Sequence, residues 1–136
     1  MPETFVDSSA WIGTIRGRDR FHPLATQSYR RLLRGAQTLV TTNLVVAETY
    51  ELLRRWEGHD IGIRFLRLLN ESARVEKIYS GEPMERQAEK ILTQYADQDF
   101  SYVDAVSFAV MRQRRMSEAF TFDHHFQVAG FILVPG

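Results

Sequence analysis

The sequence predicts one α/β domain, residues 1–136, in which a mainly parallel sheet of four to five strands lies between two layers of helices. Short apolar runs typical of buried strands alternate along the chain with longer segments of helical periodicity. This alternation is typical of a parallel sheet covered on both faces, a three-layer α/β/α architecture. The length of 136 residues suits a single domain with a sizeable core.

Capping and turn residues divide the first half of the chain into two strands and four helices. Pro23 suits the first turn of a helix, and Gly35 suits its end. Asn43 is a good N-cap for the long helix that follows it. The elements expected here are a strand at 4–7, a helix from Ser8 that breaks near Gly13 or Gly17, a helix at 23–35, a strand at 39–42, and helices at 44–56 and 61–69.

The second half continues the alternation and contains the most informative helix. Residues 102–115 are apolar on most faces, yet Asp104 lies among them. A helix of this kind is usually buried, and a carboxylate near its start must be capped, paired or bound to a cation. The other elements expected are strands at 75–79, 119–122 and 131–134 and a helix at 84–95.

Four acidic residues are predicted to meet at one edge of the sheet. Asp7 ends the first strand, and Asp123 stands just past the strand at 119–122. Glu48 lies in an apolar stripe of the helix after the second strand, and Asp104 lies near the start of its own helix. The carboxyl ends of parallel strands are where ligands bind in such folds, so we expect a site there.

Each of these acids also has a purely structural explanation when it is taken alone. Asp7 could cap the following helix, and Asp123 could cap a short turn before Phe126. Ser101 and Asp104 have the spacing of a capping box. Glu48 could pair with an arginine. A structural account must nevertheless place all four acids at the same edge independently, which favours a shared site.

A divalent cation would remove the repulsion among clustered carboxylates. Mg²⁺ and Mn²⁺ prefer oxygen ligands, and a metal bound by carboxylates suits hydrolysis of phosphodiester bonds by activated water. No histidine spacing indicates zinc, and the adjacent His124 and His125 are expected to be surface or loop residues, with contact between one of them and a substrate phosphate as the alternative. A glycine-rich phosphate loop is absent, so no nucleotide cofactor is indicated.

Composition adds limits on location and partners. Cysteine is absent, which excludes a disulfide framework or a thiolate site. The N-terminus lacks the pattern of a signal peptide and no apolar run could span a bilayer, so a cytoplasmic protein without a membrane partner is expected. The net charge is zero, but 15 of the 17 basic residues are arginine, which suits contacts with phosphate.

The four acidic motifs resemble those of the PIN-domain ribonucleases. They read Phe-Val-Asp7-Ser-Ser, Thr-Thr-Asn-Leu-Val-Val-Ala-Glu48, Tyr-Val-Asp104-Ala and Thr-Phe-Asp123-His-His-Phe. Their order and the chain length resemble the VapC-type toxins of type II toxin–antitoxin systems, over essentially the whole chain.

The resemblance implies a set of roles for individual residues. It implies that Asp7, Glu48, Asp104 and Asp123 form the catalytic metal site, with Ser8 and Thr121 supporting it by hydrogen bonds. It further implies Mg²⁺- or Mn²⁺-dependent cleavage of RNA, a homodimer, and inhibition by a cognate antitoxin. Arginine-rich segments and the apolar side of 61–69 are the surfaces expected to serve these partners. The additional acid Asp99 is expected to be a loop residue rather than a ligand.

Two other functions remain open at this stage. One is a phosphatase that uses Asp7 as a covalent nucleophile, although position 9 is Ser where that chemistry usually has a second Asp, and the only lysines are Lys77 and Lys90. The other is a non-catalytic RNA- or protein-binding module on a nuclease-like scaffold. Cleavage of RNA that is lost with Asp7→Asn would separate the nuclease from the module, and a trapped acyl phosphate would favour the phosphatase.

Overall fold

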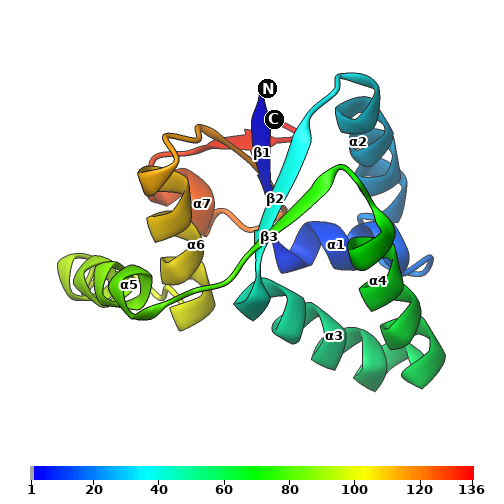
Figure 1. Ribbon diagram of the computed structural model, residues 1–136, viewed down its shortest axis with the longest axis horizontal. Coiled ribbons are helices and arrows are strands. Elements are labelled where there is room, and N and C mark those ends of the chain that lie inside the picture. Colours follow the sequence, from blue (N-terminus) through cyan, green and yellow to red (C-terminus); the bar gives the residue numbers. More distant parts are fainter. Residues whose placement is uncertain (1) are drawn as a thin grey trace.

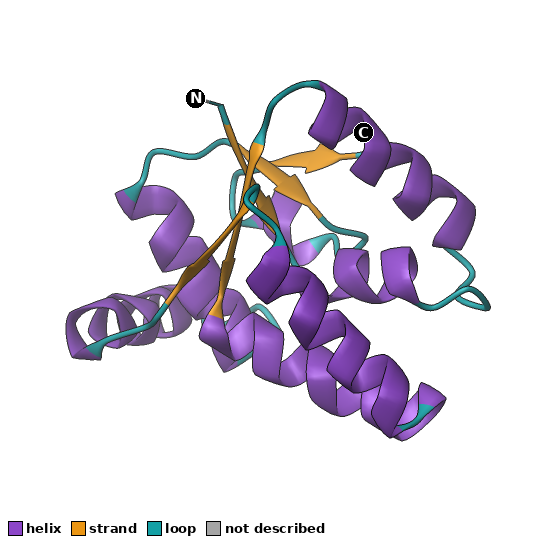
Figure 2. Cartoon of the chain, turned by 45° about the vertical axis from the view of Figure 1, so that its right-hand side comes forward, coloured by secondary structure: helices purple, strands orange, loops and turns teal. Residues whose placement is uncertain are grey.

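The computed structural model describes residues 2–136 and contains one five-stranded parallel sheet (Figures 1 and 2). The strand order is β3-β2-β1-β4-β5, and all four pairings are parallel. This confirms the predicted fold class. The strands are β1 (Glu3–Val6), β2 (Thr38–Thr42), β3 (Val75–Ile78), β4 (Glu118–Phe120) and β5 (Ile132–Val134).

Seven helices in the described chain cover the two faces of the sheet. They are α1 (Ser8–Ile15), α2 (His22–Arg34), α3 (Asn43–Glu57), α4 (His59–Glu71), α5 (Glu82–Gln94), α6 (Tyr102–Gln113) and α7 (His125–Val128). In Figure 1, α5, α6 and α7 lie to the left of the strands, α1, α2 and α4 lie to the right, and α3 runs below them. The paired helices α3 and α4 extend together beyond the sheet. Among residues 2–136, no helix is both long and apolar enough to cross a membrane.

The core lies on both faces of the central strands. Phe5 of β1 is fully buried and contacts Phe126 of α7, whose ring packs edge-on against Phe108 of α6. On the other face, Trp11 packs edge-on against Phe65 of α4. Helix α6 is buried continuously from Asp104 to Met111, as its apolar composition predicted. The sheet edge that carries the acids is therefore held between two packed layers.

Several local details differ from the sequence predictions for physical reasons. The N-cap of α3 is Thr42, whose hydroxyl accepts the Val45 N–H at 3.1 Å, rather than Asn43. The Asn43 side chain instead accepts the Ser80 N–H at 2.8 Å, which ties α3 to the segment after β3. Helix α1 ends at Ile15, close to Gly17, which is one of the two predicted breaks, and Gly13 does not break it. A Cβ at this position would lie 3.0 Å from Ala25 Cβ, so Gly13 allows α1 and α2 to approach closely.

Candidate active site

The strand order places a topological switch point at the carboxyl ends of β1 and β4. β1 pairs with β2 on one side and with β4 on the other, so the chain crosses in opposite directions from this point. Ligands bind at such topological switch points in open α/β sheets. Asp7 directly follows β1, and Asp123 follows β4 by three residues. The predicted edge is therefore also the edge that this topology favours for binding.

Asp7 is the most deeply buried of the four acids. It precedes α1 at the N-cap position, but its side chain makes no capping hydrogen bond. Its Oδ2 instead accepts hydrogen bonds from Thr121 at 3.0 Å and from Ser9 at 3.2 Å. Burial raises the pKa of Asp7 from 3.8 to about 7, and the charges of Asp104 and Glu48 add to the increase. Helix capping therefore does not explain this residue.

Thr121 connects Asp7 to Asp123 across the switch point. Its hydroxyl donates to Asp7 and accepts the Asp123 N–H at 3.0 Å. The Asp123 side chain is 32% exposed, so its setting is looser than that of Asp7. One Asp123 oxygen accepts the His125 N–H at 2.9 Å, which is the turn-capping role considered for this residue. Capping uses only part of the acceptor capacity of the carboxylate.

Glu48 joins the same group through Ser8. The Ser8 hydroxyl donates to Glu48 Oε1 at 2.5 Å, although 40 positions separate the two residues. None of the ion pairs within residues 2–136 involves Glu48, so the structure contradicts the alternative of an arginine pair. The apolar stripe of α3 thus directs this half-buried carboxylate toward the start of α1.

Asp104 is both a capping residue and a member of the acidic group. Its side chain and backbone form a capping box with Ser101, with bonds of 3.1 and 3.0 Å. The same oxygen that accepts the Ser101 N–H lies 3.2 Å from His125 Nδ1. Burial raises the pKa of Asp104, and the charge of Asp123 raises it further. The capping box therefore fixes the position of a carboxylate that also faces Asp123.

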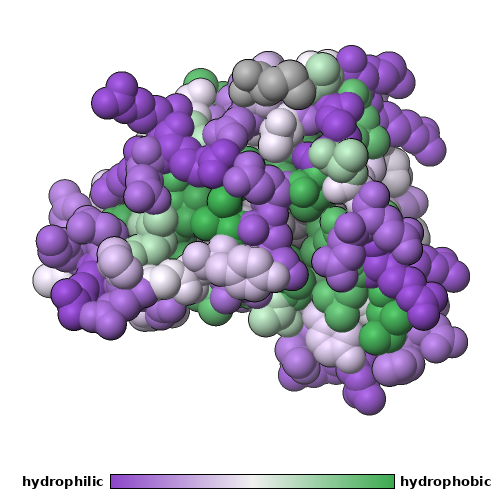
Figure 3. All heavy atoms as spheres, viewed as in Figure 1, coloured by the Kyte–Doolittle hydropathy of each residue, from purple (hydrophilic) through white to green (hydrophobic). Residues whose placement is uncertain are grey.

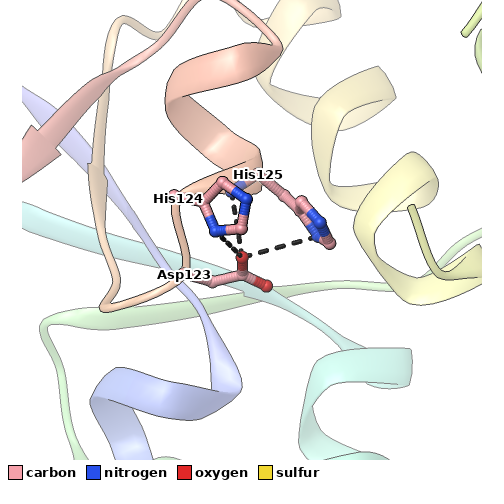
Figure 4. Close-up of side chains that lie close together, drawn as sticks. All are labelled: Asp123, His124 and His125. Atoms are coloured by element: carbon pink, nitrogen blue, oxygen red, sulfur yellow. Dashed lines mark hydrogen bonds and ion pairs between the residues drawn. The ribbon is translucent and has the colours of Figure 1, made fainter. Parts of the chain in front are cut away.

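The two adjacent histidines occupy different environments (Figure 4). His124 is 76% exposed, as expected, with Nδ1 at 3.8 Å from Asp123. His125 is only 18% exposed, begins a helix and lies between Asp104 and Asp123, so the prediction of a surface or loop residue is wrong for it. It begins α7, and its ring packs edge-on against Phe100 at 5.3 Å. That packing turns the imidazole inward.

Sequence reasoning missed two residues that hold the site together. Ser9 donates to Asp7, and its oxygen accepts the Phe122 N–H at 2.9 Å. His125 connects Asp104 to Asp123. The spacing of Asp123 and His125 could have predicted their contact, because an aspartate commonly accepts a hydrogen bond from the backbone N–H two residues ahead. Asp99 is exposed in a loop, in agreement with expectation.

Hydrogen bonds and ion-pair contacts connect Asp7, Asp104 and Asp123, and Glu48 bonds to Ser8, the chain neighbour of Asp7. Ser8 links the start of α1 to Glu48, Thr121 links Asp7 to Asp123, and His125 links Asp123 to Asp104. The oxygen donors and the raised pKa values of Asp7 and Asp104 fit a hard divalent cation, because such an ion offsets the repulsion. Ligand atoms of Asp123, His124 and His125 also lie within 4.8 Å of one another. His124 is too exposed to be a strong member of that trio.

Residues 4–132 match the PIN domain, so the chain belongs to the PIN-domain family. The predicted membership of this family is thereby confirmed. The chain is 36% identical over 132 residues to the 23S rRNA-specific endonuclease VapC20 of Mycobacterium tuberculosis strain CDC 1551 / Oshkosh, covering 96% of each chain. The protein of the same name from strain H37Rv matches equally well.

Solved structures support the same assignment. The crystal structure of Mycobacterium tuberculosis VapC20, described as a sarcin–ricin loop cleaving toxin, superposes with a TM-score of 0.84 at 32% identity, covering 95% of this chain and 96% of that one. FitAcB from Neisseria gonorrhoeae gives a TM-score of 0.69 at 14% identity, covering 96% of this chain and 95% of that one. VapBC2 from Rickettsia felis, bound to promoter DNA, gives 0.71 at 12% identity, covering 96% of each chain. The last two share the fold with this chain.

Proposed function

We propose that the protein is a metal-dependent endoribonuclease and the toxin of a toxin–antitoxin pair. The observation that carries the proposal is the linked group of Asp7, Glu48, Asp104 and Asp123 at the switch point of the sheet. Membership of the PIN-domain family and 36% identity to a ribosomal RNA endonuclease support it.

The burial of Asp7 behind two hydroxyl donors argues against the phosphatase, because a covalent nucleophile must reach its substrate.

The four carboxylates are proposed to hold Mg²⁺ or Mn²⁺. When bound, such an ion activates water and stabilises the charge that develops on the leaving oxygen. Asp7, Glu48 and Asp104 are the proposed principal ligands, and Asp123 contributes from its more exposed position. Thr121 and Ser9 orient Asp7 through its Oδ2, and Ser8 orients Glu48. Asp7 and Asp104 must lose any bound proton before they can act as ligands, because both pKa values are raised.

We propose ribosomal RNA as the substrate class. The relatives whose names specify a target act on 23S rRNA, and the similar crystal structure is of a toxin that cleaves the sarcin–ricin loop. That target is part of the ribosome, so we propose that the protein works in the cytoplasm. The net charge of zero implies that RNA contacts come from local arginine groups rather than from the overall charge.

An antitoxin and a second copy of the chain are the proposed protein partners. Apolar side chains reach the surface along α4, on the right of Figure 3, where Ile61, Leu66 and Leu68 are only partly buried. Trp56, at the end of α3, is 46% exposed. Apolar surface of this kind, flanked by arginines, suits a protein partner. Co-expression with a small antitoxin encoded by a neighbouring reading frame is expected to give a complex without ribonuclease activity, whereas an active, lone monomer would contradict this proposal.

Cleavage of ribosomes and of an isolated sarcin–ricin hairpin tests the nuclease proposal. We expect cleavage with Mn²⁺ or Mg²⁺ and none with EDTA. Asp7→Asn, Asp104→Asn and Glu48→Gln should abolish it, because each removes a proposed ligand while keeping the side-chain volume. Asp97→Asn, at an exposed position, is the matched control and should cleave normally. Parental cleavage by Asp104→Asn would refute the assignment of this residue.

A further inference from the structure

Three side chains form a layered stack beside the acidic site. The rings of Phe21 and Phe122 are parallel within 4°, with their centroids 4.3 Å apart. The guanidinium carbon of Arg20 lies 4.4 Å from the centroid of the Phe21 ring. Phe21 and Phe122 are both half-buried, and Arg20 is exposed. We call these three residues the Arg20 stack.

This arrangement differs from the aromatic packing of the core. Phe108 and Phe126 are fully buried and meet at 85°, and Trp11 meets Phe65 at 62°. These edge-on pairs are buried, so their ring faces are covered by other side chains. A parallel pair with a planar guanidinium near one ring instead offers a flat surface on which a further planar group can stack.

The Arg20 stack is continuous with the proposed catalytic carboxylates. Phe122 lies between Thr121 and Asp123 in the chain, and its N–H donates to Ser9 Oγ at 2.9 Å. The same Ser9 hydroxyl donates to Asp7 Oδ2 at 3.2 Å. A phosphodiester held at the carboxylates would therefore have its neighbouring nucleotide close to this stack.

The loop that carries Arg20 is held in place by its own hydrogen bonds. Asp19 accepts the Phe21 N–H through Oδ2 at 2.9 Å and the His22 N–H through its carbonyl at 2.9 Å. His22 Nδ1 lies 2.8 Å from the Gly13 carbonyl oxygen, which ties the start of α2 to α1. A loop ordered before its ligand arrives loses less conformational entropy on binding.

Arg20 also differs from its neighbours in charge pairing. Arg16 and Arg18 both direct Nε toward Glu57, at 2.8 and 3.4 Å. None of the ion pairs formed within residues 2–136 includes Arg20. Its positive charge is therefore available to a ligand, whereas part of the charge of the other two is neutralised within the protein.

We propose that the Arg20 stack is a nucleotide-binding subsite for RNA, in which an unpaired base next to the scissile phosphate stacks on the exposed face of the Arg20 guanidinium. Recognition of RNA commonly uses unstacked bases lying on aromatic rings or on arginine planes. The positive charge also reduces the repulsion between the RNA backbone and the carboxylates. This inference rests on the proposed ribonuclease function and names residues that position its substrate.

The test measures binding of a short single-stranded RNA that carries the fluorescent base aminopurine at each position in turn. Binding is followed by anisotropy in EDTA, so that the proposed metal-dependent cleavage does not operate. We expect one position to be quenched on binding by the native protein. Arg20→Ala should remove that quenching and weaken binding by about tenfold or more, on the order of one lost stacking contact. Arg20→Lys keeps the charge but not the plane, so it should also lose the quenching.

Arg18→Ala is the matched control, because it removes the same charge from the same loop without touching the stack. It should keep the quenching. Phe21→Leu should lose the quenching while its melting temperature verifies folding. Cleavage by the native protein combined with unchanged quenching in Arg20→Ala would overturn the subsite and leave the nuclease proposal intact. Arg20-dependent quenching without any cleavage would overturn the nuclease proposal and leave the subsite intact. Loss of antitoxin binding alone in Arg20→Ala would assign the stack to a protein partner and overturn the inference.

Discussion

Asp7 has a strongly raised pKa, because its charged form is unfavourable in the folded protein. Its pKa is about 7, compared with 3.8 for an ordinary aspartate, because it is buried and faces other acids. The folded state therefore holds the Asp7 proton more tightly than the unfolded state does. This group's contribution to the free energy of unfolding is complete below about pH 4 and is lost as the pH rises to about 7.

The sign of this effect gives a test with the metal-free protein. Asp7→Asn should flatten the loss of stability between about pH 4 and about pH 7, because the amide does not titrate and each pKa unit is worth about 1.4 kcal/mol. Urea unfolding of both proteins at several pH values measures the difference. Asp97→Asn, at an exposed position, should keep the parental slope. An identical slope in Asp7→Asn would mean that Asp7 is ionised throughout.

The helix start at Ser101 shows how an ordinary local signal and a functional residue coincide. Ser101→Ala removes the hydroxyl that accepts the Asp104 N–H, so it should destabilise the protein by about 1 kcal/mol. It should also lower cleavage, because the capping box fixes the first turn that carries Asp104. Thr26→Ala is the control, because it removes a hydroxyl from α2, away from the acids. It should leave cleavage unchanged. Full activity in Ser101→Ala would show that the cap serves only the helix.

Gly13 gives a second test at the level of helix packing. Gly13→Ala places a Cβ 3.0 Å from Ala25 Cβ and 3.5 Å from the Phe122 ring. Overpacking typically costs 1–3 kcal/mol, and the better helix propensity of Ala returns about 1 kcal/mol, so we expect a net loss of roughly 1 kcal/mol. Thermal unfolding measures it. Gly17→Ala meets no atom within 4 Å and should be nearly neutral, whereas equal effects of the two changes would contradict close packing as the reason for Gly13.

Elements with strong local patterns were predictable from the sequence, and features set by tertiary contacts were not. The apolar run of α6 and its capping box follow from neighbouring residues, and both are present. Thr42, not Asn43, caps α3, because the Asn43 side chain accepts the N–H of Ser80, 37 positions away. The inward turn of His125 depends on Phe100, which no local pattern reveals.

The whole molecule assembles its site from four distant parts of the chain. Strand alternation predicts a parallel sheet, and the placement of two acids at strand ends and two in helices predicts that the acids meet at one edge. The strand order β3-β2-β1-β4-β5 could not be predicted from local patterns. The pairing of β1 with β4 joins the first strand to one that comes more than a hundred residues later. That pairing brings Thr121 to Asp7.

Metal binding should therefore appear as a property of the whole fold. A cation that binds only the folded protein adds RT ln(1 + [L]/Kd) to its stability, about 1.4 kcal/mol at tenfold excess over Kd. For a domain of this size we expect the melting temperature to rise by roughly 3–6 °C with Mn²⁺ or Mg²⁺. Glu48→Gln removes one of the mutually repelling charges, so its metal-free form should melt above the parent. The same change should reduce the rise that Mn²⁺ produces.

Melting curves of both proteins in EDTA and in increasing Mn²⁺ separate these two effects. Glu51→Gln is the matched control, because Glu51 lies on the exposed side of the same helix and should keep the full response to Mn²⁺. Equal metal increments in the parent and in Glu48→Gln would mean that Glu48 is not part of a metal site. The bond from Ser8 to Glu48 would then be explained as a structural link between α1 and α3, two helices that pack against each other.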